Sequence, residues 1–240
     1  MFEIFRKFTN LFVAFSEKGD GNLKLGDNPE ETASENRERF FRKLGLNPKD
    51  IVVNGLIQED IVQVVRTKDR GSVLLKTDAS ITSEKGIFLS ITAADCLPVF
   101  YFDSQKEVVA IAHAGWRGLA KDILPKVVQR MIDEFQSNPK DILVGIGPGI
   151  GECHYDVKED VAAHFRDFPL AVINREGKIF LDLKKVAATQ LQQAGILAKN
   201  IEVSLLCTYC EKATYFSWRR DKTQIPKVQT MLALIGMRKL

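Results

Sequence analysis

The sequence predicts an α/β protein: a single layered domain over residues 1–240, with mixed β-sheets flanked by helices. Strand-like and helix-like segments interleave along the chain, but without the regular count of βαβ units typical of an all-parallel sheet. A hydrophobic content of 45% with 27% charged residues is typical of a globular protein, and 240 residues suffice for a sizeable core. No apolar run approaches the roughly 20 residues of a membrane span, so no membrane partner is expected.

The N-terminal half should contain one helix followed by short strands. The helix is expected to start at Asn28 and Pro29, a cap followed by proline at the first helical position, and to stop at Gly45. β-Branched or strand-like apolar segments then predict strands at residues 61–65, 73–75, 87–92, 99–102 and 107–112.

The C-terminal half should mix helices and strands. Apolar residues at helical spacing predict helices at residues 119–135 and 157–165, and a third from Asp182 to Gly195. Apolar runs predict strands at 142–146 and 201–206, whereas the run at 231–235 fits a strand or a helix.

The last two predicted strands of the N-terminal half should form a hairpin that brings a thiol to an imidazole. A register that places Asp103 opposite Lys106 also places Cys96 opposite His113, with Cβ atoms about 5 Å apart. Pro98 cannot donate to the ladder, and a bulge there would slip the pairing by one residue. The imidazole can activate the thiol as a nucleophile, or both groups can bind zinc.

The charge of the chain indicates which partners it can bind, and its N-terminal and cysteine residues indicate its cellular compartment. Thirty-four Lys and Arg against 31 Asp and Glu leave a net charge of +3 without a clustered basic patch, so no nucleic-acid partner is expected. Residues 1–10 lack the apolar core of a secretory signal, which predicts a cytoplasmic protein whose four cysteines are reduced thiols. Three histidines are too few for a copper cluster. No feature of the sequence sets the number of subunits.

Two other motifs have weaker interpretations. The glycine-rich loop 145–151 follows a predicted strand and can offer backbone N–H groups to an anion, but Ile150 breaks the spacing of a dinucleotide site. Cys207 and Cys210 form a C-x-x-C, which we interpret as two buried or exposed thiols, because no second such pair completes a structural zinc site and no thioredoxin-like context surrounds it.

Five segments resemble, in order, the motifs of the laccase-domain family, whose members were once labelled polyphenol oxidases. They are 92–98 (TAADCLP), 112–118 (AHAGWRG), 145–157 (GIGPGIGECHYDV), 207–208 (CT) and 216–221 (FSWRRD). The resemblance implies a layered α/β sandwich, also compared with cysteine hydrolases. It further implies that the partners are a purine nucleoside and phosphate. The reactions would be phosphorolysis of adenosine, inosine, guanosine or methylthioadenosine, and deamination of adenosine at a zinc site.

The resemblance also implies a metal site, at which this chain departs from the family pattern. The family holds zinc with two histidines and one cysteine, of which Cys96 and His113 match the cysteine and the second histidine. Gln58 stands at the position of the first histidine. An amide oxygen binds zinc far more weakly than imidazole, so zinc is expected only with weakened affinity. The candidates to replace the lost ligand are Glu59, Asp60 and His154.

Other site residues follow from the same motifs. Lys18 stands where the family has an arginine and, with Arg117, would position phosphate. Arg220, in the last motif, would meet phosphate or ribose. Asp95 and Glu59 are alternative candidates for the proton carrier in deamination, the reaction that should suffer most from the missing zinc ligand. Lys18 and Asp95 therefore join the thiol–imidazole pair in the expected catalytic set.

Two alternative functions stay open. A metal-free cysteine hydrolase would use Cys96 as nucleophile and His113 as base, with Asp95 or a backbone carbonyl orienting the ring. A catalytically weakened nucleoside-binding protein would instead be stabilised by nucleosides without turning them over.

Overall fold

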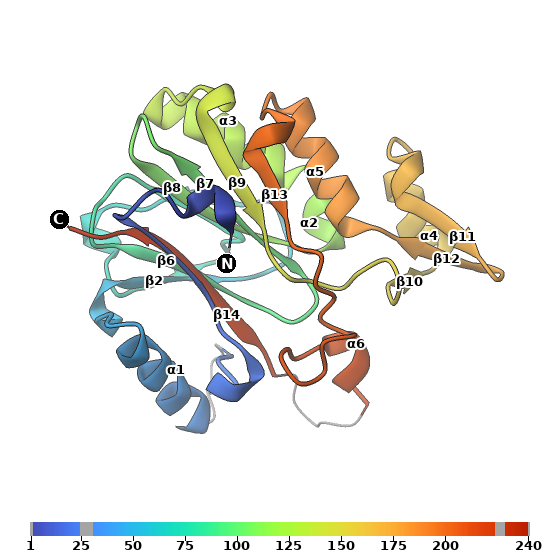
Figure 1. Ribbon diagram of the computed structural model, residues 1–240, viewed down its shortest axis with the longest axis horizontal. Helices are drawn as coiled ribbons and strands as arrows, with labels where there is room; N and C mark the ends of the chain where they lie inside the picture. The colour runs from blue at the N-terminus through green and yellow to red at the C-terminus, as the bar shows by residue number, and fades with distance from the viewer. Residues whose placement is uncertain (1, 25–30, 224–228, 240) are drawn as a thin grey trace.

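Two mixed β-sheets lie face to face at the centre of the computed structural model, which describes residues 2–24, 31–223 and 229–239 (Figure 1). The six-stranded sheet has the order β13 (Ile201–Val203), β9 (Ile142–Ile146), β7 (Leu97–Asp103), β8 (Val108–Ala114), β5 (Ala79–Thr82) and β3 (Val62–Val64). The five-stranded sheet has the order β1 (Leu11–Phe15), β14 (Met231–Met237), β6 (Phe88–Ala93), β2 (Ile51–Gly55) and β4 (Val73–Leu75). Both sheets contain parallel and antiparallel pairs.

Helices cover the outer faces of both sheets. The six-stranded sheet packs against α3 (Ile123–Phe135) and α5 (Leu183–Gln193), and the five-stranded sheet packs against α1 (Glu31–Lys43) (Figure 1). The layers therefore run helix, sheet, sheet, helix, which confirms the predicted α/β class with mixed sheets. In the described part of the chain, no helix is both long enough and apolar enough for a membrane crossing.

A smaller sheet projects to one side, at the right of Figure 1. It has the order β10 (Asp156–Val157), β12 (Lys178–Leu181) and β11 (Val172–Arg175), with α4 (Glu159–Ala162) packed beside it. Two short helices lie near the ends of the main strands: α2 (Trp116–Ala120) follows β8, and α6 (Trp218–Asp221) follows the long segment after β13.

The side chains of β7 alternate between two hydrophobic cores. Val99 and Tyr101 pack on the side of α3 and α5, whereas Phe100 and Phe102 pack against the five-stranded sheet. Successive side chains of a strand point to opposite faces, so a central strand of this sandwich is apolar on both sides. This explains why the sequence shows a continuous apolar run here.

The helix predicted over 119–135 is interrupted. Asp122 adopts a left-handed backbone conformation (φ 57°) and separates α2 from α3. The amide nitrogen of Gln190 donates to the carbonyl of Leu119 and to the carboxylate of Asp122, at 2.8 Å each, and so stabilises the break. The interruption depends on a side chain from a distant helix, which helical spacing alone cannot show.

The other element predictions differ mainly in their bounds. The ambiguous run at 231–235 is a strand, β14, hydrogen-bonded between β1 and β6. The strand predicted over 201–206 ends at Val203, and the helix predicted over 157–165 is α4 followed by a 3₁₀ turn. Asn28 and Pro29, predicted to start the first helix, lie outside the described residues.

The register predicted for the hairpin of β7 and β8 is wrong by two residues. Asp103 pairs with Val108, so it is Pro98 and not Cys96 that lies opposite His113. The cause is the loop: Asp103 Oδ1 accepts the backbone N–H groups of residues 105 and 106 at 2.9 and 3.1 Å, and residue 107 is left-handed (φ 50°). A displacement by two residues keeps every side chain on its face. Cys96 therefore becomes a diagonal neighbour of His113.

Candidate functional site

The thiol of Cys96 and the imidazole of His113 lie together at the ends of two adjacent strands. Cys96 directly precedes β7, and His113 is the penultimate residue of β8. Both flank Gly115, where a Cβ would stand 2.9 Å from Cys96 Sγ and 3.8 Å from His113 Cε1. Burial lowers the pKa of His113, but the Cys96 sulfur and the Asp78 carboxylate outweigh burial and raise it to about 10. The Cys96 sulfur and the Asp78 carboxylate thus both favour the protonated form of His113.

Gly115→Ala is expected to disturb this pair directly. The added methyl group overlaps Cys96 Sγ, so the unfolding free energy should fall by about 1–3 kcal/mol, as for other insertions into a packed interior. Gly19→Ala is the matched control, because nothing lies within 4 Å of a Cβ built at Gly19. Urea unfolding of both variants measures the difference. Wild-type stability in Gly115→Ala would contradict the close approach.

The carboxylate of Asp78 anchors both His113 and the preceding loop. Its Oδ1 lies 3.5 Å from His113 Nδ1, and its oxygens accept the backbone N–H groups of Gln58 and Glu59 at 2.9 Å each. Asp78 is fully buried. Carboxylates commonly orient functional histidines through the ring nitrogen that faces away from the ligand. Asp78 thus holds the loop of Gln58 by hydrogen bonds and lies close to the His113 ring on the same side.

The loop of Gln58 shares the Asp78 carboxylate with His113, but the Gln58 side chain is bonded to another residue. Its side chain is exposed, and its amide oxygen accepts a hydrogen bond from Arg117 Nη1 at 3.0 Å. Arg117 itself stacks over Trp116, with its guanidinium 4.4 Å from the ring centroid. A cation bound to the amide oxygen disfavours a metal ion there. Within the described residues, no third His, Cys, Asp or Glu joins Cys96 and His113 in a metal-binding group, whereas catalytic zinc takes three protein ligands. These residues do not fit a catalytic zinc ion.

The residues expected to replace the missing ligand have other partners. Glu59 forms an ion pair with Lys121, and Asp60 forms one with Lys126. His154 belongs to a separate group of cysteines, described below. None of the three completes a metal site with Cys96 and His113.

Asp95 connects the start of β7 to residues 207–221, which we call the C-terminal segment. Its carboxylate accepts hydrogen bonds from Thr208 Oγ1 at 2.6 Å, Ser217 Oγ at 3.0 Å and the backbone N–H of Arg219 at 2.7 Å. Burial raises the pKa of Asp95, although these hydrogen bonds oppose the rise. Both oxygens are thus occupied by protein donors. These contacts hold Thr208, Ser217 and Arg219 around the Asp95 carboxylate, and its role as a proton carrier stays a prediction.

The contacts of Arg220 disagree with the expected phosphate-binding role. Its guanidinium donates to the carbonyl oxygens of Thr208, Tyr209 and Tyr215, and to both carboxylate oxygens of Asp221. These bonds use all of the N–H donors that a guanidinium has. Arg220 therefore clamps the C-terminal segment and has no donor left for phosphate.

Asp221→Asn tests this clamp through the pH dependence of stability. Burial favours the neutral carboxyl, but hydrogen bonds from Arg220 and from the backbone N–H of Ser217 outweigh it and lower the pKa of Asp221 below its ordinary 3.8. Such a group stabilises the fold above its unfolded pKa, and this contribution is lost as the pH falls through the folded pKa. The unfolding free energy of wild type should exceed that of the variant by about 1–3 kcal/mol at neutral pH. The unfolding free energies of wild type and variant, measured with urea, should converge at acid pH. A difference that stays the same at every pH would refute the clamp.

Lys18 approaches the site from the side of the C-terminal segment. Its Nζ lies 3.4 Å from the carbonyl oxygen of Lys212 and 5.6 Å from the ring centroid of Phe216. The side chain is exposed, so its ammonium group can meet an anion. Within the described residues, no hydrogen bond or ion pair joins Lys18 to Cys96 or His113. The structure therefore places Lys18 near the partners of Asp95 and not in the thiol–imidazole pair.

The glycine-rich loop packs closely against the start of β7. Gly147 donates its backbone N–H to the carbonyl of Pro98 at 2.8 Å, and Ile150 donates to that of Asp95 at 2.9 Å. A Cβ at Gly149 would stand 2.5 Å from a methyl carbon of Leu97. The loop therefore uses these N–H groups and its small residues for packing, and not for the anion considered from its sequence.

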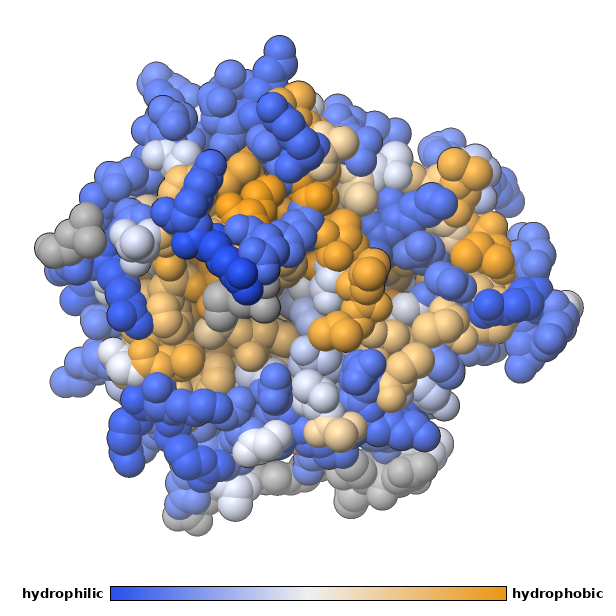
Figure 2. Space-filling model, in the orientation of Figure 1, coloured by the Kyte–Doolittle hydropathy of each residue, from blue (hydrophilic) through white to orange (hydrophobic). Residues whose placement is uncertain are grey.

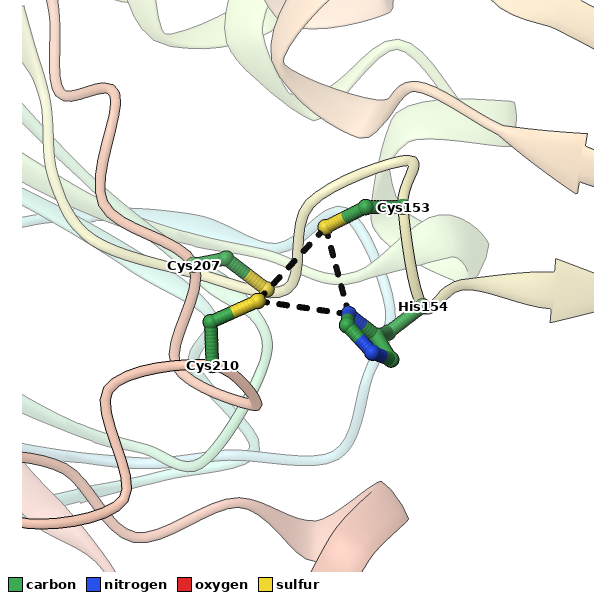
Figure 3. A group of neighbouring side chains, drawn as sticks. All are labelled: Cys153, His154, Cys207 and Cys210. Carbon is green, nitrogen blue, oxygen red and sulfur yellow. Dashed lines mark hydrogen bonds between the residues drawn. The ribbon is translucent and has the colours of Figure 1, made fainter.

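Two distant segments bring four metal-binding side chains together (Figure 3). The ligand atoms of Cys153, His154, Cys207 and Cys210 all lie within 4.8 Å of one another. Cys207 and Cys210, interpreted from the sequence as two buried or exposed thiols, therefore have two further potential ligands beside them. Their partners come from the loop after β9 and not from a second C-x-x-C.

A cavity of about 330 Å³ opens elsewhere, on the face shown in Figure 2. Hydrophobic side chains gather on this face, over β13 and the segment that follows it, where Leu205 is 93% exposed. The cavity lining includes Phe2, Phe15, Glu17, Leu206 and Tyr215, and it includes neither Cys96 nor His113. It is thus separate from the thiol–imidazole pair.

Comparison with known proteins gives the family of the chain. The model of the family described as multi-copper polyphenol oxidoreductase laccase matches residues 14–238. This chain belongs to that family. Within the laccase family, "Purine nucleoside phosphorylase YlmD" of Bacillus subtilis is 32% identical, over 98% of this chain and 89% of its own length. "Purine nucleoside phosphorylase" of Deinococcus radiodurans is 36% identical, over 88% of this chain and 79% of its own.

Solved structures support the same assignment. The crystal structure of YlmD from Geobacillus stearothermophilus superposes with a TM-score of 0.91 and 31% identity, covering 97% of this chain and 93% of that chain. A Bacillus licheniformis protein described as hypothetical protein YfiH superposes with a TM-score of 0.90 and 33% identity, over 97% and 94% of the two chains. The fold and the laccase-family membership are therefore shown together.

The structure adds residues that the laccase-family motifs did not single out. Asp78 lies just before β5, a strand that was not predicted because its residues, Ala-Ser-Ile-Thr, form no apolar run. Thr208 was identified only as part of a motif, and its hydrogen bond joins it to Asp95, which lies 113 positions earlier in the sequence. For Cys153, the signal was its position beside His154 in one motif, with further cysteines in another.

Proposed function

We propose that this chain is a purine nucleoside phosphorylase, which converts a purine nucleoside and phosphate into the free base and ribose 1-phosphate. The observation that carries the proposal is the contact of Cys96 with His113 beside Gln58 and Arg117. Relatives that are named purine nucleoside phosphorylases, and that match most of this chain, support the substrate class.

In this reaction a phosphate oxygen bonds to the anomeric carbon of ribose while the bond to the purine nitrogen breaks. Arg117 and Lys18 are exposed cations and would hold the phosphate. His113, between the Cys96 sulfur and the Asp78 carboxylate, would give the departing purine its proton. Asp78 would keep the ring in position throughout.

Deamination of adenosine is the weaker activity in this proposal. Attack on the purine needs an activated water, which a bound metal ion ordinarily supplies. Gln58 provides no imidazole, so zinc would bind here with low affinity and the deaminase rate should fall below the phosphorolysis rate. The free cysteines suit a reducing compartment, and we place the reaction in the cytoplasm.

Product analysis tests the proposal. Purified protein is incubated with inosine, guanosine or adenosine, with and without inorganic phosphate, and the products are separated by chromatography. We expect free base and ribose 1-phosphate in equal amounts, only when phosphate is present. Thermal stabilisation by nucleosides without turnover would show instead a nucleoside-binding protein. Absence of both effects would remove the proposal.

A second candidate function is a metal-free cysteine hydrolase. The observation that favours it is the sequence of contacts from Cys96 to His113 and from His113 to Asp78, which resembles a nucleophile, base and orienting acid. Here Asp78, and not Asp95, orients the ring. Rapid alkylation of Cys96 at neutral pH in metal-free protein, with hydrolysis of a thiol-ester substrate, would support this function. Slow alkylation together with phosphorolysis would exclude it.

A further inference from the structure

The four side chains drawn in Figure 3 come from two loops that are distant in sequence. Cys153 and His154 lie between the glycine-rich loop and β10, and Cys207 and Cys210 lie in the segment between β13 and α6. Their sulfur and nitrogen atoms point toward one another across a common centre. We call this group the cysteine–histidine tetrad.

The spacing of the tetrad matches that of ligands around one tetrahedral ion. Zinc–sulfur bonds of about 2.3 Å place two sulfurs about 3.8 Å apart in a tetrahedron, and a zinc–nitrogen bond shortens the edge slightly. Cys153 Sγ and Cys210 Sγ lie 3.8 Å apart. The His154 Nδ1 atom lies 3.2 Å from Cys153 Sγ and 3.3 Å from Cys210 Sγ. The side chains need only small adjustments to surround a zinc ion.

Neighbouring groups support the tetrad as a built site. The backbone N–H of Gly151 donates to Cys207 Sγ at 3.1 Å, as expected around a thiolate ligand. The imidazole of His154 stacks on Tyr209, with ring centroids 4.1 Å apart and an interplanar angle of 16°, which fixes its orientation. Gly151 also cannot carry a side chain easily, since a Cβ would stand 3.1 Å from Cys153 Sγ and 3.2 Å from Cys207 Cβ.

We propose that Cys153, His154, Cys207 and Cys210 bind one structural zinc ion. Three thiolates and one imidazole are a donor set that zinc prefers, and a site closed by four protein ligands leaves no position for a reacting water. The ion is therefore not the catalytic metal implied by the resemblance, and this proposal does not depend on the proposed function.

The ion would hold together segments that shape the candidate site. Cys207 precedes Thr208, which bonds to Asp95, and the carbonyls of Thr208 and Tyr209 receive the guanidinium of Arg220. On the other loop, His154 precedes Tyr155, whose ring lies under the Arg219 guanidinium at 5.0 Å. Loss of the ion should loosen both loops together.

Metal analysis of protein purified without chelator and without a histidine tag tests the proposal. Wild type should carry about one zinc ion per chain, because four ligands make one tetrahedral site. Cys210→Ser and Cys153→Ser should each lose most of it. Cys96→Ser is the matched control, since it removes a cysteine of the other site, and it should retain the metal. Loss of zinc in Cys96→Ser with retention in Cys210→Ser would overturn the proposal.

Cobalt substitution provides a readout that does not depend on how the variants fold. Metal-free wild type titrated with Co²⁺ under reducing conditions should show sulfur-to-cobalt charge-transfer absorption and the intense visible bands of tetrahedral coordination, saturating at about one equivalent. Zinc should then displace the cobalt. Weak bands of octahedral cobalt, or a Cys153–Cys210 disulfide in protein kept under reductant, would contradict the assignment.

Discussion

Asp95→Ala is expected to give the largest loss of stability of any single substitution near the candidate site. The variant leaves the hydroxyl groups of Thr208 and Ser217 and the backbone N–H of Arg219 without their buried acceptor. Each orphaned buried donor costs about 1–3 kcal/mol, so the unfolding free energy should fall by about 3 kcal/mol or more. Residue 95 is also left-handed (φ 85°), which alanine disfavours. The rate of phosphorolysis should also fall, because the segment held by Asp95 detaches from the start of β7.

Asp95→Asn is the matched control for this prediction. Asparagine tolerates left-handed backbone and keeps one acceptor oxygen, so it should lose clearly less stability than alanine. Denaturant unfolding measures both variants. Equal and small losses in the two would show that Asp95 does not connect the C-terminal segment to the site.

Gln58→His is expected to give the largest gain of function. It adds a third strong zinc donor beside Cys96 and His113, and histidine is among the residues that accept the left-handed backbone of position 58 (φ 60°). The variant should bind about one more zinc ion per chain than wild type, since catalytic zinc takes three protein ligands. Its adenosine deaminase rate should rise, because the added ion supplies an activated water.

Gln58→Asn separates this effect from a general change in the loop. It keeps an amide and a left-handed residue, so its zinc content should equal that of wild type. Metal analysis and inosine formation from adenosine without phosphate are measured on both variants. Unchanged zinc content in Gln58→His would show that position 58 is not the missing ligand position.

The prediction of the fold from the sequence succeeded where continuous apolar runs mark the central strands. The strands β7, β8 and β9 are apolar runs of the right length, and their burial on both faces follows from the sandwich. The register failed because it depends on the side chain of Asp103 folding onto the loop and on Glu107 adopting a left-handed backbone. A non-glycine residue in that conformation leaves little trace in a sequence.

The sequence motifs identified residues of the candidate site, but they did not show which other residues these contact. Cys96 and His113 meet because a register displaced by two residues preserves the face. The roles of Asp95 and Arg220 could not be predicted, since their hydrogen-bond partners come from segments far along the chain. The tetrad was missed for the same reason: its ligands form two pairs in separate motifs, and only the fold brings the pairs together.

The central claim is that Cys96 and His113 form the reaction centre of a phosphorylase, and inosine turnover in Cys96→Ser and His113→Gln tests it most directly. Ribose 1-phosphate formation is measured at saturating phosphate, with the melting temperature of each variant as a check on folding. We predict that wild type is active and that each folded variant loses about 10²-fold or more of the rate, the usual scale of a lost proton-transfer group. Wild-type rates in both variants would contradict the claim.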